Sequence, residues 1–114
     1  MARTAVSVPF YATAFRNHDL AAALEQIGAI SPRYGAKSWA VYQSHDDLYK
    51  FLFFVEFDNK RDWERYWYGE EFSEMRAACS GWYQVPLLYN WYDIVGDGSL
   101  DGNGNGVTAN AVEA

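Results

Sequence analysis

The sequence predicts one α+β domain with the element order β-α-β-β-α-β around an antiparallel sheet. Its 114 residues have the length of a single domain. Segments rich in β-branched and aromatic residues, which are typical of strands, are separated by two segments with apolar residues at helical spacing. A short polar turn joins the second strand segment to the third, and this pattern indicates a hairpin.

The first two elements are a strand and an amphipathic helix. Residues 4–14 are rich in β-branched and aromatic residues, and Pro9 among them suggests a sheet edge or a bulge. Asn17 is a suitable N-cap for the helix that follows, and Pro32 ends that helix. The apolar residues of the helix recur every three or four positions, at Leu20, Leu24, Ile27 and Ile30.

The next two strands form the predicted hairpin. Residues 37–44 alternate, with Trp39 on one face and Tyr42 on the other, and the polar turn 45–47 follows. Residues 49–57 are apolar on both faces, and a strand of this kind is covered on both sides. We expect the helices to cover one side and a second copy of the sheet to cover the other, which predicts a homodimer.

The second helix is rich in aromatic residues and is expected in two pieces. Asn59 begins it as the first residue of a weak capping box. Trp63 and Trp67 are four positions apart and therefore share one face of the helix. Gly69 is expected to break or kink the helix, which residues 70–79 then continue.

A last strand and a tail complete the chain. Residues 87–95 are again apolar on both faces, which predicts a buried strand. Residues 97–114 are rich in Gly, Asn and Asp and contain no aromatic residue, so we expect a disordered tail. The folded domain is then residues 1–96, with the ferredoxin-like arrangement of strands and helices.

Composition and charge exclude several classes of function. The net charge is −6, and the Lys and Arg residues are scattered, whereas nucleic-acid binding needs several convergent cations. The same charge disfavours an anionic membrane surface, and the apolar run 51–55 is too short to span a bilayer. Cys79 is the single cysteine, so no intrachain disulfide can form and a reducing cytoplasm is expected.

No metal site and no reactive thiol are expected. His45 stands in a polar turn whose adjacent residues cannot all converge on one ion, and His18 lies near a helix start at the surface. Residues 101–106 match the start of a calcium-binding loop, but Val112 stands where that loop needs an acidic residue. Cys79 has no basic cluster beside it and is expected in the core.

Three stretches of the sequence carry a resemblance to a known family. They are a tyrosine-bearing strand and turn (residues 42–47), an acidic cap leading into an aromatic helix (57–63), and an interruption (69–72) followed by Arg76. Over residues 5–95 the chain resembles the antibiotic-biosynthesis-monooxygenase-like group of the dimeric α/β-barrel superfamily. This resemblance implies a homodimer whose two sheets pack into a barrel, with a ligand cavity between sheet and helices in each subunit.

The resemblance also implies an activity. The family includes cofactor-free oxygenases of polyphenolic polyketides, haem-degrading enzymes and quinol oxygenases. In the haem-degrading branch a helix histidine binds iron, and because its counterpart here is Arg76, we expect no haem. The site residues of the polyketide oxygenases correspond to Phe53, Phe57, Trp63 and Arg76, and of these only the arginine keeps its type.

We therefore expect a cofactor-independent monooxygenase-like enzyme that acts on a small aromatic or quinone-like compound in an apolar pocket. Tyr66 and Arg76 are the candidate catalytic residues, because a phenol exchanges protons and a guanidinium holds an anion. The residues expected to hold the aromatic rings are Phe53, Phe57, Trp63, Trp67 and Tyr42. The alternative is a non-catalytic ligand-binding or assembly protein, in which Tyr66 is a core residue and Arg76 pairs with Glu71 or Glu74 at the surface.

Overall fold

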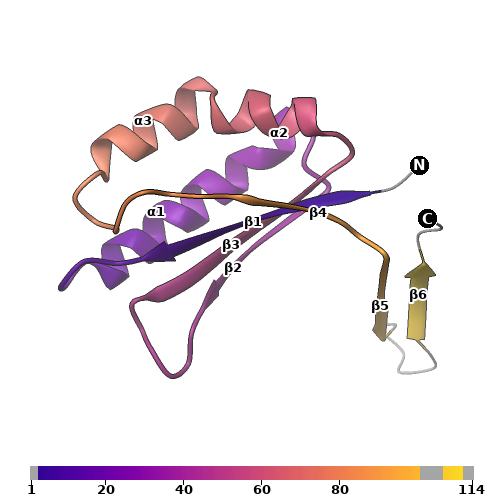
Figure 1. Cartoon of the computed structure of the whole chain (residues 1–114), viewed down its shortest axis with the longest axis horizontal. Helices are drawn as coiled ribbons and strands as arrows, with labels where there is room; N and C mark the ends of the chain where they lie inside the picture. The colour runs from indigo at the N-terminus through magenta and orange to yellow at the C-terminus, as the bar shows by residue number, and fades with distance from the viewer. Residues whose placement is uncertain (1–2, 101–106, 112–114) are drawn as a thin grey trace.

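The protein is an α+β domain in which the helices pack on one face of a four-stranded antiparallel sheet (Figure 1). The structure is a computed structural model and describes residues 3–100 and 107–111. Its elements are β1 (Thr4–Tyr11), α1 (Asn17–Ile30), the 3-10 helix η1 (Ser31–Tyr34), β2 (Ser38–Gln43), β3 (Lys50–Phe57), α2 (Lys60–Trp67), α3 (Glu70–Ala78), β4 (Asn90–Asp93), β5 (Gly96–Leu100) and β6 (Val107–Ala111). The strand order in the main sheet is β2-β3-β1-β4.

This architecture confirms the predicted β-α-β-β-α-β order and the interruption of the second helix. Asn59 caps α2, because its side chain accepts a hydrogen bond from the Asp62 backbone N–H. Pro9, predicted at an edge, lies in β1 between two neighbouring strands. Since β4 pairs only with residues 4–7 of β1, the side of Pro9 that lacks an N–H has no strand beside it.

The core lies between the sheet and the helices. Every second residue of β1 and β3 points into it, and α1 covers these residues with its apolar stripe. The fully buried side chains of the two strands are Val6, Val8, Phe10, Phe51, Phe53, Val55 and Phe57. Helix α1 approaches β2 closely at Gly28, where an added Cβ would overlap the ring of Trp39.

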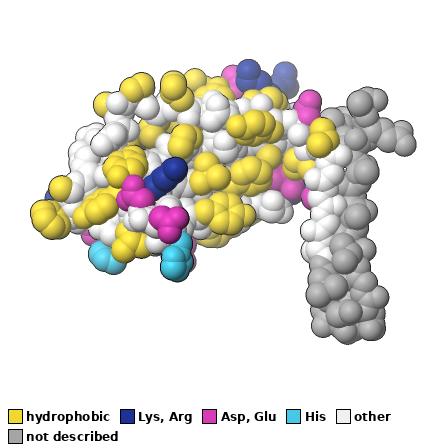
Figure 2. Space-filling view, turned by 60° about the horizontal axis from the view of Figure 1, so that its bottom comes forward, with side chains coloured by type: hydrophobic (Ala, Val, Ile, Leu, Met, Phe, Trp, Pro, Cys, Tyr) yellow, Lys and Arg dark blue, Asp and Glu magenta, His cyan; other side chains and the backbone are white. Residues whose placement is uncertain are grey.

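The other side of the sheet has no helix on it (Figure 1). We call it the open sheet face and define it by Tyr11, Tyr42, Leu52, Phe54 and Tyr92, which the strand register places on one side. Tyr42 and Tyr92 are 56% and 51% exposed. Figure 2, in which the lower side of Figure 1 is turned toward the reader, shows hydrophobic side chains spread across this part of the surface.

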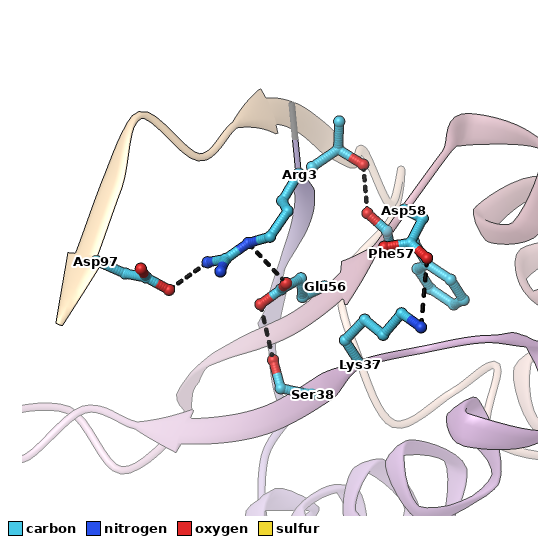
Figure 3. A network of polar contacts seen from close by, with 8 residues as sticks. Arg3, Lys37, Ser38, Glu56, Phe57, Asp58 and Asp97 are labelled. Atoms are coloured by element: carbon cyan, nitrogen blue, oxygen red, sulfur yellow. Dashed lines mark hydrogen bonds and ion pairs between the residues drawn. The ribbon is translucent and has the colours of Figure 1, made fainter. Parts of the chain in front are cut away.

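A separate two-stranded hairpin follows the main sheet. Strands β5 and β6 pair in antiparallel fashion apart from the four-stranded sheet (Figure 1). Arg3 lies between Asp97 of β5 and Glu56 of β3 and forms an ion pair with each (Figure 3). Residues 97–100 and 107–111, which the sequence predicts to lie in a disordered tail, thus belong to two strands that pair with each other. The calcium-loop-like residues 101–106 lie outside the described residues.

Candidate functional site

The aromatic residues of α2 and α3 gather around Trp67. The ring of Trp67 stacks on that of Trp63 at 5.2 Å between centroids, and the ring of Phe72 lies 4.7 Å from it. Tyr89, from the segment before β4, is 5.6 Å away. We call these four residues the Trp67 cluster. Their spacing explains the arrangement, since Trp63 and Trp67 share a helix face and the turn at Gly69 folds Phe72 back onto them.

Gly69 allows this turn because it has no side chain. A Cβ at this position would lie 2.6 Å from the carbonyl oxygen of Arg65 and 3.0 Å from the hydroxyl of Tyr34. Such distances are too short for any other residue unless the backbone shifts. The break between α2 and α3, which brings Phe72 to Trp67, therefore depends on a glycine here.

Arg76 is the charged residue that contacts the Trp67 cluster. Its guanidinium carbon lies 4.2 Å from the centre of the Trp67 ring and 5.1 Å from that of Phe72, within cation–π range. Nη2 donates to the Ser73 hydroxyl at 3.4 Å, while Nη1 is buried and has no acceptor among the described residues. Burial lowers the pKa of Arg76 from its ordinary value. The expected pairing with Glu71 or Glu74 is not observed, and Glu71 accepts from the Tyr34 hydroxyl instead.

A second buried donor adjoins the same ring. The side chain of Trp63 is fully buried, and its Nε1 has no hydrogen-bond acceptor in the part of the chain that the structure describes. Most buried polar groups in proteins do have a partner. Trp63 and Arg76 are thus two buried donors beside Trp67 that have no acceptor among the described residues.

Tyr66 lies near the cluster but is occupied elsewhere. Its side chain is 1% exposed, and its hydroxyl donates a hydrogen bond to the carbonyl oxygen of Ile27 in α1. Burial raises the pKa of Tyr66 far above its ordinary value, so the phenol stays neutral. The geometry is that of a core tyrosine with a satisfied hydroxyl, and a catalytic role for Tyr66 stays a prediction.

The structure brings most of the other predicted ring-holding residues to one side of the sheet. Phe53 meets Phe72 edge-on at 5.9 Å, and Phe57 lies 6.2 Å from Trp63, both in the core. Tyr42 is on the opposite side, because the register places it against Leu52 on the open sheet face. Tyr42 therefore does not lie beside the other ring-holding residues, and a role for it in binding stays a prediction.

A groove between α1 and α3 was not predicted from the sequence. It has a volume of about 520 Å³, and Trp63, Trp67 and Arg76 do not line it. Its floor is apolar, with Ala23, Ile27 and Met75, and Glu74 stands on its rim. Helical spacing indicates which residues share a helix face, but it does not indicate which two helices lie side by side.

The described residues give no sign of a metal centre or a reactive thiol. No group of three or more His, Cys, Asp or Glu side chains is placed to hold a metal ion within residues 3–100 and 107–111. Cys79 is buried, and burial raises the pKa of its thiol, which disfavours the reactive thiolate. No helix in this part of the chain combines the length and the apolar character needed to cross a membrane.

Comparison with solved structures gives the class of fold. A protein from Nitrosomonas europaea, named as a candidate antibiotic biosynthesis monooxygenase, superposes with a TM-score of 0.75 at 16% identity, covering 82% of this chain and 90% of that one. A Bordetella bronchiseptica protein named in the same way gives 0.72 at 14%, covering 83% and 99%. A Pseudomonas aeruginosa protein gives 0.74 at 15%, covering 82% and 95%.

The chain therefore has the ferredoxin-like α+β fold of antibiotic-biosynthesis-monooxygenase-like proteins. At these sequence identities the likeness is one of fold. No protein-family model matches the sequence, and no curated protein does. The activity must be argued from the residues themselves, since one fold hosts many functions.

Proposed function

We propose that the protein is a monooxygenase-like enzyme that acts, without a cofactor, on a small aromatic or quinone-like compound bound at the Trp67 cluster. The observation that supports this most is the buried Nη1 of Arg76, which has no acceptor among the described residues and belongs to a guanidinium that lies over Trp67. The names of two structural neighbours point to the same class of reaction. A cytoplasmic location stays a prediction from the single cysteine.

The chemistry follows from the donors. A buried donor without a partner costs roughly 1–3 kcal/mol, and an oxygen atom of a bound ligand would remove that cost. A guanidinium also stabilises the negative charge that a phenolic or carbonyl oxygen gains when the substrate loses a proton, before the resulting carbanion reacts with dioxygen. Arg76 would thus hold the anion, and Trp67 and Phe72, which are 7% and 1% exposed, would contact the rings of the ligand once the neighbouring segment has moved.

The ligand would enter beside the segment that carries Tyr89. This segment precedes β4 and has no helix or strand structure over residues 84–89. Val85 and Leu88 are 74% and 66% exposed, so their side chains do not anchor it to the core. A shift of this segment would open the Trp67 cluster while leaving the sheet in place.

The active form is proposed to be a homodimer. Strand β3 buries Phe53 and Phe57 beneath the helices, while the register places Leu52 and Phe54 on the open sheet face. A patch of this kind on a soluble domain indicates an interaction surface. A second copy of the same sheet is the partner that the resemblance implies.

The test is oxygen consumption with anthrone and hydroquinone substrates. Arg76→Gln removes the charge and should lower kcat/KM at least tenfold, and Arg76→Lys should recover only part of it, because Lys lacks the planar fork. The matched control is Arg65→Gln on α2, where the Arg65 side chain is 61% exposed and pairs with Asp62. Turnover that does not change in Arg76→Gln would refute the role of Arg76.

A second candidate is the non-catalytic ligand-binding or assembly protein. Phe53, Phe57, Trp63 and Tyr66 are at most 1% exposed, which favours a purely structural aromatic core. This alternative predicts binding of aromatic compounds or of a partner without any consumption of oxygen. Equal oxygen uptake by the protein and by buffer, across anthrones and hydroquinones, would favour it.

A further inference from the structure

We propose that the groove between α1 and α3 is a second binding site, for a slender apolar molecule with an ammonium group. The site is separate from the Trp67 cluster, and the inference does not rest on the proposed oxygenase activity. Met75 lines the groove, whereas the guanidinium of the next residue, Arg76, lies over Trp67 on a different side of α3.

The two helices run in opposite directions along the groove. Tyr34, which follows α1, donates to Glu71 at the start of α3, and this contact marks one end. Asp19, in the first turn of α1, lines the groove together with Cys79, which follows α3, and Trp82, and these residues mark the other end. The groove therefore has two chemically distinct ends.

Its dimensions suit a narrow ligand. The lining residues Asp19 to Ile30 span about three turns of α1, or roughly 16 Å of helix. The volume of the groove is about 520 Å³. An alkyl chain or a single ring fills such a space, and a volume of this size is typical of small-molecule sites.

The charges select a cation. No Lys or Arg is among the lining residues. At one end, Glu71 and Glu74 are three positions apart on α3 and therefore lie side by side, and no salt bridge to either is found among the described residues. At the other end, Asp19 is paired with Arg16 at 2.9 Å, and Arg16 lies over the Trp82 ring.

The ligand is thereby oriented. Its ammonium group would lie at the acidic end, near Glu74 and near Glu71, which also accepts from the Tyr34 hydroxyl. Its apolar body would extend over Met75, Ala78 and Cys79 toward Trp82. A carboxylate of the same length would meet like charge at the acidic end and should bind weakly or not at all.

The experiment uses n-octylamine, n-octanol and sodium octanoate with the full chain. Backbone amide shifts in ¹H–¹⁵N spectra would locate binding, and iodoacetamide alkylation of Cys79, the single cysteine, gives a second readout. Octylammonium should shift the amide signals of residues 19–30 and 71–82 until they saturate, and it should not shift those of Trp63 and Tyr89. It should also slow the alkylation of Cys79. Octanoate should neither shift these signals nor slow the alkylation.

Two variants test the assignment. Glu74→Gln, at an exposed rim position, should weaken octylammonium at least threefold and leave octanol unchanged. Ala22→Trp should fill the groove and abolish binding, whereas Ala29→Trp, an equally exposed alanine of α1 that does not line the groove, should not. Equal binding of octanoate, shifts outside the groove, or an unchanged affinity in Glu74→Gln would overturn the proposal.

Discussion

The hydroxyl of Tyr66 in α2 donates to the backbone carbonyl of Ile27 in α1 and so ties the two helices together inside the core. The neighbouring carbonyl oxygen of Gly28 accepts two hydrogen bonds from Ser31, one from the backbone N–H and one from the hydroxyl. Pro32, whose N–H would normally bond this carbonyl in a helix, has no N–H to donate. The end of α1 is thus satisfied by side chains as well as by backbone.

Tyr66→Phe should lower the free energy of unfolding by about 1 kcal/mol, the usual net value of one hydrogen bond. Urea denaturation would measure the change. Because the phenol is occupied by Ile27, turnover at the Trp67 cluster should stay within about twofold once the protein is folded. A stable Tyr66→Phe protein that has lost its activity would instead give Tyr66 the catalytic role that the sequence suggested.

Gly28→Ala should be destabilising by about 1–3 kcal/mol, the usual range for overpacking, because the added methyl group overlaps the Trp39 ring between α1 and β2. Gly81→Ala is the matched control, since a Cβ at Gly81 meets nothing within 4 Å. Urea denaturation of both proteins gives the comparison. Equal stability of the two variants would show that α1 does not depend on close contact with β2.

The open sheet face should hold two copies together. Leu52→Lys with Phe54→Lys places charge in the proposed interface, and we expect light scattering after size exclusion to change from a dimer mass to a monomer mass. Leu48→Lys is the control, because Leu48 is 55% exposed in the turn between β2 and β3, outside the sheet. A monomeric unmodified protein would contradict the dimer directly.

Asp47 should titrate below its ordinary range. The Tyr11 hydroxyl donates to it at 2.7 Å and the Tyr49 backbone N–H at 3.0 Å, and these bonds to the charged form lower its pKa. Since the folded pKa lies below the unfolded one, the contribution to stability is present above the unfolded pKa and is lost as the pH falls through the folded pKa.

Carbon NMR of the Asp47 carboxyl group would measure that titration directly. Tyr11→Phe should raise the midpoint toward the ordinary value of aspartate, because the hydroxyl is the largest cause of the shift. Tyr42→Phe provides a control on the same sheet face, since no bond between Tyr42 and Asp47 is found in the described part of the chain. An unshifted Asp47 in the unmodified protein would contradict the hydrogen bond.

Local spacing predicted the parts of the structure that depend on it. The i, i+4 pair Trp63 and Trp67, the break at Gly69 and the two apolar faces of β3 all follow from rules that act within a few residues. The sheet face on which Tyr42 lies could not be predicted in this way. It depends on the register between β2 and β3, and the sequence of the turn does not fix that register.

The candidate site shows the same limit. Arg76 reaches Trp67 across the break between α2 and α3, where helical periodicity does not apply. The groove requires α3 to lie beside α1, and that placement comes from packing over the sheet. The sequence indicated that an arginine and aromatic rings were available, whereas their contact is a property of the folded chain.

The break at Gly69 has a consequence for motion. It divides one long element into two, α2 with 8 residues and α3 with 9, and isolated helices of this length are marginal in water. Each therefore depends on its anchoring side chains, and for α3 the fully buried anchor is Phe72. Loss of the Phe72 contact is accordingly expected to release α3 as a unit, together with Arg76, while the sheet keeps its hydrogen bonds.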